Sequence, residues 1–196
     1  MNASDLRVGV VGVGVVLAEA HGVAQHVATL HLRALQRVER ASEGDPPAGC
    51  LDRYDRAHPG RFVTFAHLDW REVHYVKVLL DGIFGRECFL NEIVWAYDFG
   101  GRSMRRWPAK HDTILVYVKD PAAYYFDSDA VDREPYMAPG LVTPEKAARG
   151  KYPTDTWWHT IVPTRGREKT GYPTQKPLGI LRRIVVASSR PGDTVL

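Results

Sequence analysis

Cysteine and long apolar runs are nearly absent from this 196-residue chain. The two cysteines, Cys50 and Cys88, lie far apart and form no CxxC pair, which argues against a disulfide framework and against a zinc site. No apolar run approaches the roughly 18 residues of a membrane helix. The glycine-rich run at residues 8–17 lacks the positive charge and the cleavage site of a signal peptide. We therefore expect a reducing compartment, the cytoplasm, and no membrane partner.

Neither sign of charge dominates, because the net charge is +3 and charged residues make up 25% of the chain. A mildly basic balance permits nucleic-acid binding without establishing it. The distribution of charge says more than the total. Basic residues gather in two short segments that also hold Gly, Pro or aromatic residues: Arg102, Arg105, Arg106, Lys110 and His111 in the first, and Arg165, Arg167 and Lys169 in the second.

The chain divides near residue 60, and the length suits one domain with a sizeable core. Residues 1–60 show only a weak pattern, with an apolar run, a possible helix at 23–40 and a loop. Residues 61–68 are typical of a buried strand. Asp69 and Glu72 predict a capping box for a helix over residues 71–84, whose apolar residues recur every three to four positions.

Gly85 is placed to end that helix. Residues 92–97 and 113–118 are rich in β-branched and aromatic residues, and we expect them to form an antiparallel pair of strands. The order strand, helix, strand, strand predicts an α/β fold for residues 61–121.

Residues 122–170 are rich in proline, paired aromatics and charge, which predicts an irregular insert with at most short helices, one of them at 144–149. Long irregular inserts in compact domains are usually functional. Residues 171–196 begin with a polar turn that opens a helix. A Pro-Gly-Asp turn at 191–193 ends that helix, and a strand is expected to begin there.

Three glycines near the N-terminus, Gly9, Gly12 and Gly14, evoke a dinucleotide-binding turn. The fingerprint needs a further glycine where Leu17 stands, and no acidic strand end follows at the right distance. A buried strand or an irregular terminus is therefore the better interpretation, and an oxidoreductase built on this turn is the weakest of the functional alternatives.

The aromatic residues Trp95, Tyr97 and Phe99 precede Gly100-Gly101 and the first basic cluster. Aromatic faces at a strand end can stack on an extruded base, and nearby guanidinium groups can hold phosphates. A strand with core aromatics and a solvated basic loop explains the same composition. Composition alone favours neither of these two interpretations.

The segment Thr174-Gln175-Lys176-Pro177 stands at an expected helix start. Its side chains and free backbone N–H groups suit a carboxylate or a phosphate, although an ordinary helix cap explains them as well. His67, Asp69, His74 and His111 fit no standard metal spacing, so we expect no metal site.

In their order and spacing, several segments resemble the DNA N4-cytosine/N6-adenine methyltransferases of bacterial restriction–modification and cell-cycle systems, from about Phe62 to Leu196. The matching segments are His67-Leu68-Asp69-Trp70-Arg71-Glu72, residues 74–81, Ile83-Phe84-Gly85, residues 91–95, Tyr97, Gly100-Gly101, Lys110-His111-Asp112 and Tyr172-Pro173-Thr174-Gln175-Lys176-Pro177. The order is similar to the permuted class in which the catalytic half precedes the cofactor half.

The resemblance implies a partial Rossmann-like fold that depends on S-adenosylmethionine, with an incomplete sheet and residues 122–170 as the target-recognition insert. It implies that Trp95, Tyr97 and Phe99 lie by the base pocket, and that Thr174, Gln175 and Lys176 lie beside the methionine end of the cofactor. The residues implied to face DNA are Arg102, Arg105, Arg106, Lys110, Arg165 and Lys169.

The family's catalytic Asp-Pro-Pro-aromatic tetrapeptide has only a weak counterpart in Asp45, Pro46 and Pro47, because Ala48 replaces the aromatic ring and no buried strand precedes it. A surface loop is the better interpretation. The family's main cofactor loop, Asp-Pro-Phe-x-Gly-Ser-Gly, is expected just beyond Leu196. We therefore expect a truncated chain, or one half of a split enzyme with a second chain as partner.

The resemblance thus implies a site-specific methyltransferase of double-stranded DNA, located with the bacterial nucleoid. Methylation of adenine N6 is favoured over cytosine N4 by the weight of the family. The alternative is a non-catalytic DNA-binding remnant or subunit.

Overall fold

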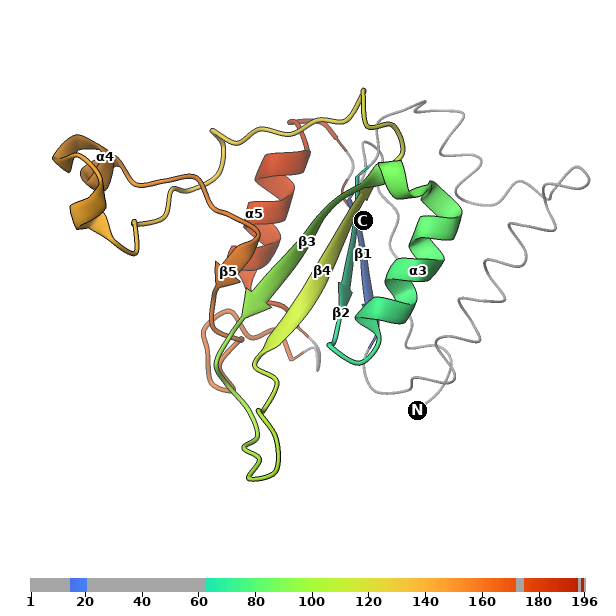
Figure 1. Ribbon diagram of the computed structural model, residues 1–196, viewed down its shortest axis with the longest axis horizontal. Coiled ribbons are helices and arrows are strands. Elements are labelled where there is room, and N and C mark those ends of the chain that lie inside the picture. The colour runs from blue at the N-terminus through green and yellow to red at the C-terminus, as the bar shows by residue number, and fades with distance from the viewer. Residues whose placement is uncertain (1–14, 21–62, 172–174, 194, 196) are drawn as a thin grey trace, which may run out of the picture.

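The computed structural model describes residues 15–20, 63–171, 175–193 and 195, and Figure 1 shows their arrangement. The described residues contain one five-stranded sheet in the order β1-β2-β4-β3-β5. Its strands are β1 (Val15–Ala20), β2 (Val63–Leu68), β3 (Phe89–Ala96), β4 (His111–Val118) and β5 (Thr156–Trp158). The predicted α/β architecture is confirmed, and its sheet is mixed.

Strand directions place the carboxyl ends of four of the five described strands at one edge of the sheet. β1 and β2 are parallel, as are β3 and β5, whereas β4 runs antiparallel to both β2 and β3. The carboxyl ends of β1, β2, β3 and β5 therefore lie beside the amino end of β4. We call this edge the carboxyl edge.

Helix α3 (Val73–Phe84) covers one face of the sheet. A buried cluster joins Val73 of the helix to Leu68, Leu115 and Tyr117 of β2 and β4. The Tyr117 hydroxyl donates to Asp81 Oδ1 at 2.6 Å, so a polar contact also ties the helix to the sheet. The chain leaves α3 at Gly85, whose φ of 86° favours glycine, and enters the short 3₁₀ helix η2 (Arg86–Cys88).

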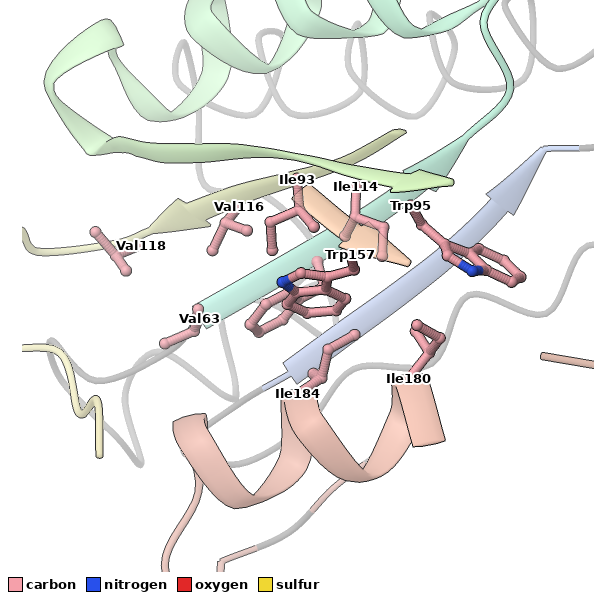
Figure 2. Packing of buried hydrophobic residues seen from close by; sticks show 10 residues of the cluster. Val63, Ile93, Trp95, Ile114, Val116, Val118, Trp157, Ile180 and Ile184 are labelled. Atoms are coloured by element: carbon pink, nitrogen blue, oxygen red, sulfur yellow. The ribbon is translucent and has the colours of Figure 1, made fainter. Parts of the chain in front are cut away.

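Helix α5 (Leu178–Ser188) covers the opposite face, as Figure 1 shows. Figure 2 shows Ile180 and Ile184 rising from α5 toward Trp157 and the sheet. Ile184 is 1% exposed and Ile180 is 3% exposed, which makes this contact part of the core. The sheet is therefore the middle of three layers, with a separate apolar cluster on each face.

The segment between β4 and β5 leaves the sheet as an arm. It holds η3 (Pro139–Leu141) and α4 (Pro144–Arg149), and Figure 1 shows α4 at a distance from the sheet. Arg183 of α5 bonds to Glu134 at 2.8 Å, and an isolated bridge joins Glu134 to Lys151 at the base of the arm. The short helix expected at 144–149 is confirmed.

Several other predictions are confirmed with shifted bounds. The strand expected at 61–68 begins at Val63, and the antiparallel pairing expected of the next two strands is present. The capping box is wrong in detail: Asp69 Oδ1 accepts from the Arg71 N–H at 2.8 Å, and Glu72 makes no side-chain cap. The helix consequently begins at Val73, two residues later than expected.

Candidate functional site

The carboxyl edge gathers chemistry-bearing side chains from five places in the chain. These are the turn after β2, the loop from Tyr97 to Lys110 that joins β3 to β4, the first residues of β4, the segments 159–171 and 175–176 after β5, and the amino end of α5. In open α/β sheets, ligands bind outside the carboxyl ends of the strands. The edge is therefore the candidate site.

A hydrogen-bonded trio lies at this edge on the face that α5 covers. Asp112 Oδ2 is 2.9 Å from His67 Nε2, and Asp112 Oδ1 accepts from the Tyr97 hydroxyl at 3.2 Å. The strand register explains the meeting, because His67 pairs with Ile114 and Trp95 pairs with Asp112. The trio thus lies on one face, with His67 on β2, Asp112 on β4 and Tyr97 directly after the end of β3.

Burial makes this trio an electrostatic unit. His67 is 5% exposed and the Asp112 side chain is 13% exposed. Burial raises the pKa of the Asp112 carboxyl, but the hydrogen bond from His67 and the charges of His67 and Lys176 outweigh it and hold that pKa below its usual range. Burial, reinforced by the negative charge of Asp112, raises the pKa of Tyr97 to about 12. Tyr97 therefore remains a donor, and Asp112 remains an ionised acceptor.

Trp95 lies beneath the trio in the core. It is 3% exposed, and its indole N–H donates to the His159 carbonyl at 2.6 Å. Its ring packs against those of His67 and Tyr97, with centroids 5.5 and 5.4 Å away. The Lys176 ammonium lies 5.9 Å from the Trp95 ring centroid. Trp95 therefore supports the neighbouring polar groups and presents no exposed ring face of its own.

The loop between β3 and β4 presents the exposed aromatic and basic groups. Phe99 is 62% exposed, and Arg102 and Arg105 are exposed as well. Lys110 Nζ donates to the Gly100 carbonyl at 2.7 Å, which ties the two ends of the loop together. An open hollow of about 780 Å³ lies within the loop, lined by residues that include Phe99, Arg102 and Lys110.

A cation–π stack holds this loop against the end of β2. The Arg106 guanidinium lies 5.3 Å from the Trp70 ring centroid, and Arg71 lies 5.9 Å from it. Asp69 accepts hydrogen bonds from Arg71 Nε at 3.1 Å and from its Nη2 at 2.5 Å. Burial raises the pKa of Asp69, but these bonds to Arg71 outweigh it and lower that pKa. Arg106 is thus partly committed to a protein contact.

Residues 159–171 and 175–176, which lie between β5 and α5, position the amino end of α5. Gln175 donates to the Glu168 carbonyl at 2.6 Å and accepts from the Thr170 N–H at 2.7 Å. The Glu168 carboxylate accepts from the Leu178 N–H at 3.2 Å, so a carboxylate of the chain itself lies at the helix start. In the same loop Arg165 and Lys169 are exposed.

The structure brings together Trp95, Tyr97 and Lys176. Gln175 instead contacts Glu168 and Thr170. Phe99 and the predicted DNA-facing basic residues lie on the loops. Asp45, Pro46, Pro47 and Thr174 lie outside the described residues, as do Gly9, Gly12 and Gly14. Sequence reasoning missed the pairing of His67 with Asp112. The available signal was a histidine in a mostly apolar strand, together with an acidic residue at the start of a neighbouring strand.

Neither a metal cluster nor a membrane helix is found in the part of the chain that the structure describes. No group of three or more His, Cys, Asp or Glu side chains in these residues could hold a metal ion. None of the described helices is long and apolar enough to span a bilayer.

The family of the chain follows from its match to a DNA methylase family model, N6_N4_Mtase, which covers residues 49–196. This stretch includes every element of the carboxyl edge except β1. The chain belongs to this family of DNA methylases.

Among characterised relatives, the DNA adenine methyltransferase YhdJ of Escherichia coli (strain K12) is 34% identical over 54% of this chain and 39% of its own length. The type II methyltransferase M.ScaI of Streptomyces caespitosus is 32% identical over 65% of this chain and 47% of its own length. M.HpaI of Haemophilus parainfluenzae is 29% identical over 84% and 60% respectively. The chain thus spans between 39% and 60% of the length of these relatives.

Among solved structures, the M1.HpyAVI–SAM complex is similar at 21% identity with a TM-score of 0.42. The similarity covers 71% of this chain and 57% of that one. It is too weak to establish a shared fold by itself.

Proposed function

We propose that the carboxyl edge is the substrate side of an S-adenosylmethionine-dependent DNA amino methyltransferase of restriction–modification type. The observation that carries the proposal is the convergence of two exposed basic loops with the Tyr97–Asp112–Lys176 group at one edge of the sheet. Family membership and the names of the relatives support it. Such a role places the chain with the bacterial nucleoid.

Double-stranded DNA is the proposed partner of the basic loops. Arg102 and Arg105 are exposed on the loop between β3 and β4, and Arg165 and Lys169 are exposed on the loop after β5. Exposed guanidinium and ammonium groups bind phosphates and release counterions, which is the main sequence-independent source of DNA affinity. The arm around α4, which Figure 1 shows at a distance from the sheet, is the proposed target-recognition region.

The target base is proposed to bind between Phe99 and the Tyr97 side of the edge. Phe99 has an exposed ring that can stack on a flipped base, whereas the buried Trp95 acts as the floor. The open hollow beside Phe99, of about 780 Å³, has the volume to admit a base. Adenine N6 is the proposed acceptor in preference to cytosine N4, in keeping with the adenine specificity in the name of YhdJ.

The cofactor is proposed to approach the amino end of α5. Lys176 supplies a cation there, and Gln175 supplies amide groups whose hydrogen bonds order the turn, so the donor set fits a carboxylate-bearing ligand. Because the Leu178 N–H already donates to the Glu168 carboxylate, Lys176 is the better candidate to bind the cofactor's carboxylate. When bound, the cofactor supplies an electrophilic methyl group on a positively charged sulfur.

The proposed reaction depends more on how the protein positions the base than on a reacting side chain of the protein. Residues of the edge would present the amino nitrogen of the base to the methyl group that the bound cofactor would supply, and the proton lost by the amino group would pass to solvent. The edge would hold the base flat against Phe99 and exclude water beneath it.

A methyl-transfer assay tests the proposal. The chain is incubated with methyl-labelled cofactor and mixed-sequence DNA, the DNA is digested to nucleosides, and the labelled nucleoside is identified. We expect label in N6-methyladenine and a loss of label with Lys176→Gln. A gel shift on the same DNA separates binding from chemistry. A shift without transfer would favour the alternative of a DNA-binding subunit that works with a second chain, and neither shift nor transfer would contradict both.

A further inference from the structure

The arm between β4 and β5 is closed at its base by backbone hydrogen bonds. The Glu134 N–H donates to the Lys151 carbonyl at 2.9 Å, and the Lys151 N–H donates to the Glu134 carbonyl at 2.8 Å. Gly150 has a φ of 77°, and a Cβ there would lie 2.8 Å from the Glu134 carbonyl oxygen, so only glycine allows this close approach. Residues 135–150, which include α4, are therefore a loop whose two ends meet.

Side chains join the two sides of this base a second time. The Arg133 guanidinium lies 4.0 Å from the Tyr152 ring centroid, and Arg133 Nη2 lies 3.7 Å from Asp129 Oδ1. The Tyr152 hydroxyl donates to the same carboxylate oxygen. The base of the arm is thus held by side chains as well as by its backbone.

Glu134 also carries a contact from the base of the arm to α5. Arg183 Nη1 lies 2.8 Å from Glu134 Oε1, and these side chains are only 22% and 25% exposed. Glu134 Oε2 lies 4.0 Å from Lys151 Nζ. The Arg183 guanidinium lies 5.0 Å from the ring centroid of Trp157, which is 6% exposed in the core cluster that includes Ile184. One guanidinium therefore contacts both the arm and the core.

The arm meets α5 at a second place, nearer to β4. The Asp127 N–H donates to the Ala187 carbonyl at 2.8 Å, and the Arg190 guanidinium just beyond the helix lies 4.4 Å from the Tyr125 ring centroid. A segment held at one place can pivot about it, and a second contact restricts the pivot. The contact of Glu134 with Arg183 supplies that second restraint.

We propose that Glu134 and Arg183 are positioning residues that fix the orientation of the arm relative to α5. The inference rests on the proposed function in one respect, because the assignment of the arm to target recognition gives its orientation a purpose. Base-edge contacts read sequence and depend on how the reading side chains are placed, whereas phosphate contacts supply sequence-independent affinity. Loss of the pair should therefore reduce sequence discrimination more than overall DNA affinity.

Amide hydrogen exchange, followed by NMR without DNA or cofactor, tests the restraint. Exchange at the Glu134 and Lys151 amides is compared in the wild type, Glu134→Gln, Arg183→Gln and the double variant. We expect each single variant to speed exchange about fivefold, because loss of the partly buried pair favours local opening of the base. The double variant should exchange about as fast as Arg183→Gln alone, because both substitutions remove one shared contact.

The matched control is Arg182→Gln, which makes the same substitution at the exposed neighbour of Arg183 on α5. Its exchange at the two amides should stay within about twofold of the wild type. A double variant about fivefold faster than Arg183→Gln would mean that the two residues act independently and would overturn the proposal. If the double variant does not fold by circular dichroism, unchanged exchange in either single variant would overturn it.

Selection from a random-sequence duplex library separates this inference from the proposed function. We expect the wild type and Arg182→Gln to enrich one sequence, and Arg183→Gln to enrich it about fivefold less. The gel-shift affinity of Arg183→Gln for mixed-sequence duplex should stay within about twofold of the wild type. Equal enrichment by the wild type and Arg183→Gln would overturn the positioning role. If the exchange cycle behaves as expected and the wild type enriches no sequence, the pair still fixes the arm, and the assignment of the arm to target recognition fails.

Discussion

At the scale of single residues, two clusters of hydrogen-bonded polar side chains contact the same sheet but lie in different surroundings. On the α3 face, Tyr117 is 0% exposed and donates to Asp81, which also pairs with Lys77 at 2.6 Å. Lys77 in turn lies 4.0 Å from the Phe89 ring centroid. The cluster of Tyr117, Asp81 and Lys77 lies between α3 and the sheet and joins them. The His67–Asp112–Tyr97 trio instead lies at an edge where a ligand can approach.

The depressed pKa of Asp112 predicts a pH dependence of stability. A carboxyl whose pKa is lower in the folded state contributes stability above its unfolded pKa, and this contribution is lost as the pH falls through the folded pKa. We expect the free energy of unfolding of the wild type to fall between about pH 5 and pH 2. Asp112→Asn should be less stable at pH 7 and should lose less on acidification.

Urea unfolding followed at several pH values measures this slope. The groups that face Asp112 are His67, Tyr97 and Lys176, so a parallel Tyr97→Phe series shows how much of the slope depends on the phenol. Identical slopes in the wild type and Asp112→Asn would contradict the account of the trio.

At the scale of elements, local periodicity predicted most of the structure. The helix at 144–149 has its predicted bounds because Thr143 caps it and Pro144 begins it. β5 was missed because three residues, Thr156–Trp158, show no alternation and pair only through contacts with β3. The same limit hid the trio, since His67 and Asp112 are 45 residues apart and meet only through the register of β2 and β4.

Helix α5 should depend on its buried stripe for its position. Ile184→Ala removes a side chain that is 1% exposed in the cluster with Trp157, and we expect a loss of about 3 kcal/mol in the free energy of unfolding. Leu178→Ala on the same helix removes a side chain that is 64% exposed and should cost less than about 0.5 kcal/mol. Urea denaturation measures both, and equal losses would contradict the assigned orientation of α5.

At the scale of the whole molecule, the described residues form a sheet between α3 and α5, with exposed basic loops at the carboxyl edge. Figure 1 shows α4 on an arm at a distance from the sheet. The resemblance stated from the sequence led to the family, which the match over residues 49–196 shows. Geometry added the distinction between buried Trp95 and exposed Phe99, which composition could not make because both are aromatic residues near one strand end.

The central claim is that the carboxyl edge binds DNA, and the salt dependence of DNA affinity tests it most directly. Each lost phosphate contact lowers the slope of log K against log salt by about 0.9. A variant with Arg102→Gln and Arg105→Gln on the loop between β3 and β4 is compared with Arg86→Gln and Arg182→Gln, which change exposed arginines on η2 and α5.

We expect the first variant to bind more weakly, with a slope smaller by about 1 to 2, and the second to match the wild type within error. Equal slopes in the wild type and both variants, with all three proteins folded, would contradict a DNA-binding carboxyl edge.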